Sequence, residues 1–289
     1  IKSFIQDAKK ESLRPEWLIG IKSSPFKTTL NRLFIDSLKT PFFFLYRKLS
    51  RDEESYSFPP RRLYKKRMFS TFKRFYIANK IESTALVSCP EKLIFKYFFI
   101  PLQFYPEVTS DYWNKELSLI NHHEVVLKIV SENPDQTFLI KEHPAAIGRR
   151  NEDFLIKLMS YKNVKFVKLL SDVNGWVKYS KGIIGNASTV TVNSIILNKP
   201  VFFFSKPYFG TKKENYLLDI SCDRINYFIK HPEEFIYEES EVFDLIKSLY
   251  LASAKGSLGS YKPLLEKSNS SKIEVTNDFK GYLFDYLNV

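Results

Sequence analysis

Short apolar runs alternate with segments of helical periodicity between residues 93 and 204. Runs rich in β-branched and aromatic residues at 94–100, 137–140, 164–169, 182–185 and 201–204 predict buried strands. Apolar residues recur every three or four positions in 123–131, 152–159, 173–179 and 189–197, a spacing typical of helices. This β-α-β-α-β order predicts an α/β fold with a Rossmann-like parallel sheet that carries helices on both faces.

The segments on either side of this region have a different character. Residues 1–92 show little alternation of strands and helices, and we expect a partial N-terminal domain whose opening strands lie upstream of Ile1. Beyond about residue 219 the pattern becomes polar and helical, with helices expected near 232–235, 241–252 and 279–287. The predicted domains are therefore 1–92 and 93–289, and the second contains the Rossmann-like nucleotide-binding unit.

The net charge of +12 is concentrated in the first quarter of the chain. Residues 1–80 contain 19 Lys/Arg and 7 Asp/Glu, and residues 55–81 contain no acidic side chain. A helix over 61–80 would carry a cationic face beside Tyr64, Met68, Phe72 and Phe75. Three interpretations stay open: binding to an anionic membrane surface, binding to an acidic glycan acceptor, or packing as a helix with a solvated basic face.

Two further features narrow the class of protein. Cys89 and Cys222 are the only cysteines and have neither a disulfide framework nor metal-site spacing, so we expect a reducing cytoplasm and no metal. No apolar run approaches the ~20 residues that span a bilayer. The basic, aromatic first quarter suggests a nucleic-acid-binding protein as a rival. Because the remainder of the chain is neutral and carries no known nucleic-acid motif, we expect no nucleic acid as partner.

Polar residues follow two of the predicted strands, at the edge where parallel sheets bind ligands. Lys141 and His143 follow the strand at 137–140, and both can face a phosphate. Asn186, Ser188 and Thr189 follow the strand at 182–185 and lead into a helix, whose first N–H groups favour an anion. The alternatives are that His143 is an ordinary loop residue and that Ser188 only caps the helix.

These blocks, in this order, resemble the bacterial capsule polysaccharide synthesis family. The matching stretches are Lys-x-His-Pro at 141–144, Asn-x-Ser-Thr at 186–189, Lys-Pro-Val at 199–201, Pro-Leu-Gln at 101–103 and Leu-Arg-Pro-Glu-Trp at 13–17. The resemblance implies a GT-B-like glycosyltransferase with two Rossmann-like domains, of which the acceptor-side, N-terminal one is incomplete here. It also implies transfer of Kdo from CMP-Kdo onto a surface or capsular polysaccharide, or its lipid-linked acceptor. Such an enzyme would lie on the inner face of the cytoplasmic membrane.

The resemblance also implies roles for individual residues. The nucleotide sugar would bind the C-terminal domain, and Glu107 would act as nucleophile or stabilise positive charge at the anomeric carbon. Glu11 would act as general acid or base. Two positions depart from the family: Asn193 stands where a ribose-binding Glu is usual, and Lys9 and Lys10 stand where an acidic residue is usual. The expected catalytic residues are Glu107, His143 and Glu11, and the expected substrate-binding residues are Arg14, Gln103, Lys141, Asn186, Ser188, Thr189 and Asn193.

Two alternative functions lie close to the expected glycosyltransferase. A polyol-phosphate transferase of the teichoic-acid type has a similar fold, a His-Pro loop and a Ser/Thr helix start. No histidine precedes residue 100, which favours sugar transfer over this rival. The second rival is a non-catalytic member of the family, which the departures at Asn193, Lys9 and Lys10 keep open.

Overall fold

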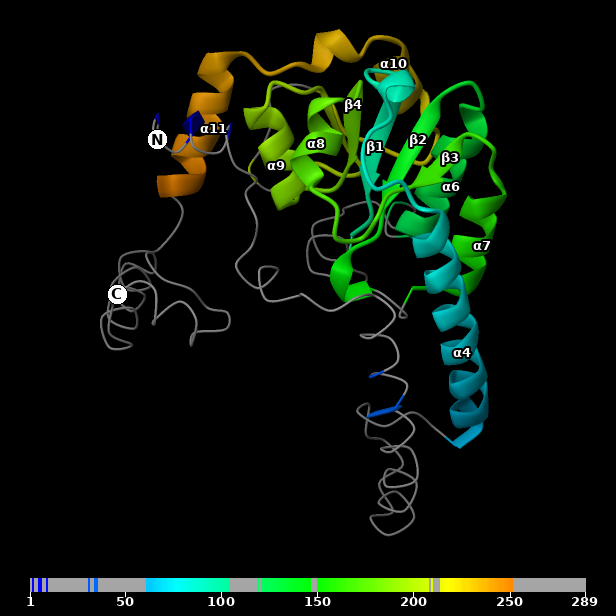
Figure 1. The fold of residues 1–289 in the computed structure, drawn as a ribbon. Coiled ribbons are helices and arrows are strands. Elements are labelled where there is room, and N and C mark those ends of the chain that lie inside the picture. Colours follow the sequence, from blue (N-terminus) through cyan, green and yellow to red (C-terminus); the bar gives the residue numbers. More distant parts are fainter. Residues whose placement is uncertain are drawn as a thin grey trace, which may run out of the picture.

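The computed structural model describes residues 61–103, 119, 121–146, 150–207, 209 and 214–251, with isolated positions among residues 2–35. Side chains of 61–72 lie outside the description. The helices and strands are α4 (Arg61–Thr84), η1 (Glu91–Leu93), β1 (Tyr97–Pro101), α6 (His122–Glu132), β2 (Thr137–Lys141), η3 (Pro144–Ala146), α7 (Glu152–Ser160), β3 (Val164–Phe166), α8 (Val173–Lys178), β4 (Gly182–Gly185), α9 (Thr189–Ile196), β5 (Val201–Phe203), α10 (Asp223–Lys230), η4 (Pro232–Phe235) and α11 (Glu239–Leu251) (Figure 1).

Five parallel strands form the sheet of this described part, in the order β3-β2-β1-β4-β5. The central strand β1 pairs with β2 through Phe98 and Phe138, and with β4 through Phe99 and Ile183. All five residues of β1 are buried, as expected for a parallel strand that is covered on both faces. The predicted α/β class and the parallel Rossmann-like sheet are confirmed.

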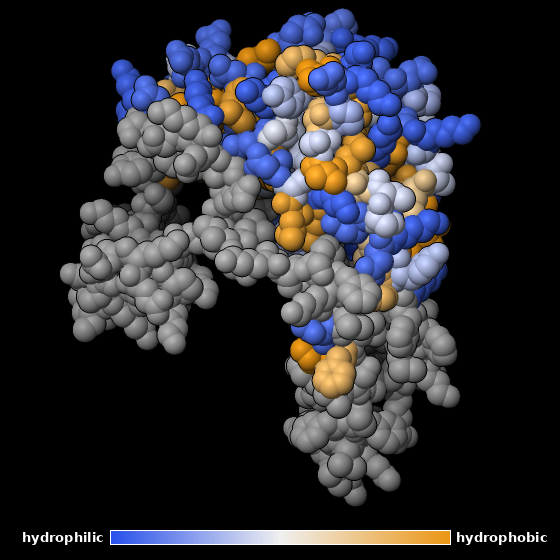
Figure 2. Space-filling model, in the orientation of Figure 1, coloured by the Kyte–Doolittle hydropathy of each residue, from blue (hydrophilic) through white to orange (hydrophobic). Residues whose placement is uncertain are grey.

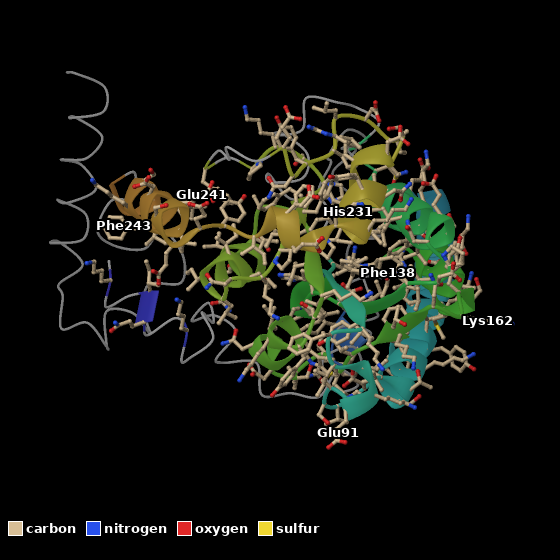
Figure 3. All side chains as sticks on the ribbon, turned by 90° about the horizontal axis from the view of Figure 1, so that it is seen from above. Glu91, Phe138, Lys162, His231, Glu241 and Phe243 are labelled. Atoms are coloured by element: carbon tan, nitrogen blue, oxygen red, sulfur yellow. The ribbon has the colours of Figure 1, made fainter. Side chains whose placement is uncertain are left out.

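Successive residues of β1 supply two hydrophobic cores, one on each face of the sheet. Phe98 and Ile100 belong to the core that α4, α6, α7 and α10 cover. Tyr97 and Phe99 belong to the core that α8, α9 and α11 cover. The alternation follows from the twofold period of side chains along a strand. Figure 3 shows Phe138 in the interior, with Glu91 and Lys162 at the periphery.

Helix α4 packs onto the sheet in its second half. Ile77 and Ile81 are buried in the same core as β1 and β2. Lys73 and Arg74 form ion pairs with Asp153 and Glu152 in the first turn of α7, at 3.2 and 2.8 Å. The helix expected over 61–80 is confirmed and extends to Thr84. Because Lys73 and Arg74 pair with α7 and Ile77 and Ile81 are buried, this half of α4 fits the interpretation of a packed helix.

Several expectations fall on other parts of the chain. The helix expected near 279–287 and most of residues 1–60 lie outside the described residues, so the division into domains at 92 and 93 stays a prediction. Helix α10 was not assigned from the sequence.

On the face drawn in Figure 2, hydrophobic residues are interspersed with hydrophilic ones. None of the helices in the described part has both the length and the apolar composition that a membrane crossing requires.

Candidate functional site

The order of the strands reverses between β1 and β4. After β1 the chain continues to α6 on one face of the sheet, and after β4 it continues to α9 on the other face. In open parallel sheets, ligands bind in the crevice outside the carboxyl ends of the two strands at such a switch point. The described segments at the carboxyl ends of these two strands are Leu102–Gln103 after β1, His122 at the start of α6, and Asn186–Thr189 between β4 and α9.

The first turn of α9 leaves two backbone donors at this end of the sheet. Ser188 caps the helix: its hydroxyl accepts a hydrogen bond from the Thr191 N–H at 3.3 Å, and the Thr191 hydroxyl accepts one from the Ser188 N–H at 2.8 Å. The N–H groups of Thr189 and Val190 have no intrahelical partner, because the first turn of any helix lacks carbonyls to receive them. Two N–H donors and the positive end of the helix dipole together make the start of α9 a candidate anion site.

A buried arginine joins the ends of β1 and β2. Arg150 contacts the Glu142 carboxylate through two nitrogens, Nε at 2.6 Å and Nη2 at 2.7 Å. Its Nη2 also donates to the carbonyl oxygen of Gln103 at 2.5 Å, and its Nη1 lies 3.2 Å from His123 Nε2. The Arg150 side chain is only 4% exposed. One side chain therefore holds the segment after β1, the segment after β2 and the start of α6 together.

Both histidines at the start of α6 are uncharged near neutral pH. Burial lowers the pKa of His122 to about 4, and the neighbouring His123 and Arg150 add to this effect. Burial also lowers the pKa of His123 to about 4, helped by Arg150 and opposed by Glu142. Because a guanidinium can only donate hydrogen bonds, Nε2 of His123 must be the acceptor and its proton lies on Nδ1.

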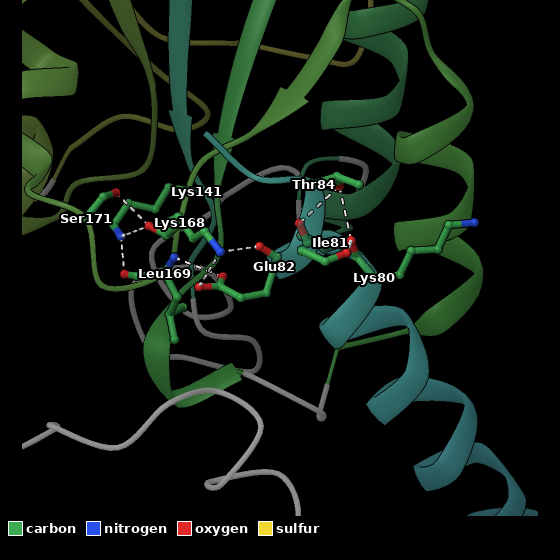
Figure 4. Close-up of polar contacts among 9 residues, drawn as sticks. Lys80, Ile81, Glu82, Thr84, Lys141, Lys168, Leu169 and Ser171 are labelled. Carbon is green, nitrogen blue, oxygen red and sulfur yellow. Dashed lines mark hydrogen bonds and ion pairs between the residues drawn. The ribbon is translucent and has the colours of Figure 1, made fainter. Parts of the chain in front are cut away.

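Lys141 is buried at the end of β2. Its ammonium donates to the carbonyl oxygens of Lys168, at 3.1 Å, and of Leu169 (Figure 4). Lys168 in turn donates to the carbonyl oxygen of Glu82 at 2.6 Å. In this arrangement Lys141 ties the end of β2 to the loop after β3, and its predicted contact with a phosphate stays a prediction.

His143 and Asn193 occupy different surroundings. His143 is half-buried in the loop after β2, and its backbone N–H donates to the Glu142 carboxylate at 2.7 Å. Burial lowers the pKa of the His143 imidazole, Arg150 and Lys141 add to this effect, and Glu142 opposes it. Asn193 is buried on α9, where its amide donates to Asn174 of α8 at 2.5 Å. Asn193 therefore lies one turn below the crevice, facing α8.

The predicted site residues are thus partly brought together. Gln103, Asn186, Ser188 and Thr189 lie at the carboxyl ends of β1 and β4, and Lys141 and His143 lie beside them at the end of β2. Glu107, Glu11 and Arg14 lie outside the described residues. Within the described ranges, no group of three or more His, Cys, Asp or Glu side chains has an arrangement that could hold a metal ion.

The sequence interpretation missed Arg150, His122 and His123 as site residues. A signal for the histidines was present, because they begin a predicted helix that follows a predicted strand, and helix starts of this kind face the ligand. Arg150 lies in the short segment before α7 and had no such signal, since its partners come from three separate segments.

A pocket adjoins this network on the side of α4. Its wall combines apolar and charged side chains, among them Ile81, Leu155, Phe166, Arg74, Glu142 and Arg150. Glu142 and Arg150 belong both to this wall and to the network, so the pocket adjoins the ion pair at the ends of β1 and β2.

No protein-family model and no curated protein matches the chain. Among solved structures, it is similar to the UDP-GlcNAc 2-epimerase of Methanocaldococcus jannaschii, with 16% identity, a TM-score of 0.37, and coverage of 63% of this chain and 52% of that one. KpsC β-Kdo 2,4 transferase of Thermosulfurimonas dismutans has 14% identity, a TM-score of 0.40, and 62% and 55% coverage. E. coli heptosyltransferase WaaC with ADP has 11% identity, a TM-score of 0.36, and 55% and 49% coverage. The chain spans about half the length of each of these proteins.

Proposed function

We propose that the protein is a nucleotide-sugar-dependent glycosyltransferase with a GT-B-like fold. The observation that carries the proposal is the anion site at the start of α9, which lies at the switch point of a sheet with Rossmann strand order. A nucleotide sugar contains a phosphate and several hydroxyl groups. The carboxyl ends of β1 and β4 offer N–H donors for the phosphate. They also offer amide and imidazole groups for the hydroxyl groups.

The phosphate would bind the N–H groups of Thr189 and Val190 and the hydroxyl groups of Ser188 and Thr189. His143 would donate a hydrogen bond to a phosphate oxygen and so stabilise the charge that develops on the leaving group. Lys141 would add positive charge behind this loop while it holds the loop in place. The proposal requires no metal.

The finer parts of the proposal come from the resemblance in sequence. They are CMP-Kdo as donor, a surface or capsular polysaccharide or its lipid-linked precursor as acceptor, and a position on the inner face of the cytoplasmic membrane. Glu107, Glu11 and Arg14 would complete the site, with Glu107 at the anomeric carbon, Glu11 as acid or base, and Arg14 on the substrate. The basic first quarter of the chain supports an anionic membrane partner.

The proposal is tested by isothermal calorimetry with CMP, UDP, GDP and CDP-glycerol. We expect selective binding of CMP. We also expect His143→Ala to weaken nucleotide binding at least tenfold, about 1.4 kcal/mol. The same variant should lower the turnover of sugar transfer sharply, with little loss of stability. The matched control is His231→Ala, because His231 lies between α10 and η4, away from the crevice.

The identity of the nucleotide that binds distinguishes the proposed function from its alternatives. Selective binding of UDP or GDP would keep the glycosyltransferase and replace the donor. Selective binding of CDP-glycerol would favour the polyol-phosphate transferase instead. Binding of no nucleotide by the wild-type protein would contradict the proposed function, and a fully active His143→Ala protein would remove His143 from the mechanism.

A further inference from the structure

One side-chain contact crosses the switch point directly. Asn186 begins the segment after β4, and His122 begins α6, the helix that follows β1. The amide nitrogen of Asn186 lies 3.1 Å from Nδ1 of His122, and both side chains are buried. The contact therefore bridges the two strands between which a ligand of this fold binds.

Asn186 is fully buried, and one of its polar atoms lacks a partner among the described residues. The residue is 0% exposed, and its backbone carbonyl oxygen accepts a hydrogen bond from the Thr191 hydroxyl at 2.9 Å. Within the part of the chain that the structure describes, its side-chain oxygen, Oδ1, has no hydrogen-bond partner. A buried acceptor without a partner costs free energy, and such an atom in a native protein calls for an explanation.

The His122 side of the contact carries no charge near neutral pH. An amide NH2 can only donate, so a ring nitrogen of His122 accepts its hydrogen bond and the imidazole stays neutral. The lowered pKa of His122 agrees with this assignment. The contact is thus an uncharged pair, and its unsatisfied atom is an acceptor.

We propose that the His122–Asn186 pair binds a hydroxyl group of the nucleotide sugar, with Asn186 Oδ1 accepting the hydrogen bond. This inference rests on the proposed function and adds His122 to the site. A phosphate or carboxylate at neutral pH offers only acceptors and cannot satisfy Oδ1, whereas a hydroxyl can donate to it. The site is therefore divided: the start of α9 takes the phosphate, and the His122–Asn186 pair takes a hydroxyl of either the ribose or the transferred sugar.

The test compares probes with and without the hydroxyl. The nucleotide that the wild-type protein binds is measured by calorimetry beside its 2′-deoxy and 3′-deoxy analogues and its nucleotide sugar. The variant is Asn186→Leu, which removes the amide and keeps its approximate volume. If the pair binds a ribose hydroxyl, we expect Asn186→Leu to bind the nucleotide about tenfold more weakly than the wild-type protein does. The variant and the wild type should then bind one of the deoxy analogues with equal affinity. For a hydroxyl of the sugar, the loss appears only with the nucleotide sugar.

Two further variants separate this effect from damage to the fold. Asn215 is the matched control, because it is another fully buried asparagine whose Oδ1 lacks a partner among the described residues. Its amide donates instead to the Val201 carbonyl of β5 and to the Tyr237 hydroxyl. Asn215→Leu should leave the preference for hydroxyl-bearing probes unchanged. If Asn186→Leu does not fold, Asn186→Asp replaces it. Asn186→Asp keeps an acceptor at this position and should keep the preference.

Three results overturn the inference. They are equal weakening of all probes by Asn186→Leu, no weakening of any, or loss of the hydroxyl preference in Asn186→Asp. When the wild-type protein binds nucleotides, these results reject the role of the pair and leave the proposed function intact. A wild-type protein that binds no probe contradicts the proposed function, and the inference falls with it.

Discussion

Replacement of Arg150 by methionine is expected to lower the free energy of unfolding by about 3–5 kcal/mol. The change removes a buried cation and takes a donor away from three groups: the Gln103 carbonyl oxygen, Nε2 of His123 and the Glu142 carboxylate, which keeps the His143 backbone N–H. Loss of one partner of a buried pair costs this much because the other charge stays buried and uncompensated. Urea denaturation at pH 7 measures the effect.

Lys73→Met is the matched control for this prediction. Lys73 also pairs with a carboxylate, that of Asp153, but the Lys73 side chain is 50% exposed. An exposed pair contributes about 0–1 kcal/mol, so the control should be nearly as stable as the wild type. A loss below about 1 kcal/mol in Arg150→Met would show that the network does not hold the ends of β1 and β2 together.

Stability is expected to fall as the pH decreases from about 6.5 to about 4, with a large contribution from His122. The pKa of His122 is about 4 in the folded protein and 6.5 when the side chain is exposed. Between these values the unfolded chain binds a proton that the folded protein does not bind, so acid favours unfolding. The contribution of His122 is roughly 3 kcal/mol, and it is fully present above pH 6.5. His123 acts in the same direction.

Unfolding in urea at several pH values, for the wild type and His122→Gln, isolates this contribution. The difference in stability between the two proteins should shift in favour of the variant by roughly 3 kcal/mol as the pH falls from 7 to 4. His231→Gln serves as the control, since His231 is outside the network. Parallel pH profiles for the wild type and His122→Gln would contradict the burial of a neutral His122.

The order of strands and helices could be predicted because each buried parallel strand is a nearly continuous apolar run. The boundaries of β4 were predicted to the residue, and those of α6 within one residue. The start of β1 was placed three residues too early, because residues 94–96 form a turn in which Phe95 has a φ of 55°. Helix α10 was missed although Ile225, Phe228 and Ile229 have helical spacing and are buried.

Less of the candidate site could be predicted, since its polar contacts join segments that are distant in sequence. The start of α9 was predicted because its cap and its donors are local features. The contact between Asn186 and His122 spans 64 residues, and the contact between Arg150 and Gln103 spans 47. Such pairs depend on which strands become neighbours, and the pattern of hydrophobic residues predicts a parallel sheet without its strand order.

A nucleotide phosphate is expected to bind at the start of α9, at the carboxyl ends of β1 and β4. Hydrogen–deuterium exchange with and without saturating nucleotide tests it directly, with the nucleotide taken from the calorimetric comparison. We predict slower exchange in the bound protein at Thr189 and Val190, and in the segments around Gln103 and His122. Unchanged exchange in these segments, with protection elsewhere in the protein, would contradict the claim.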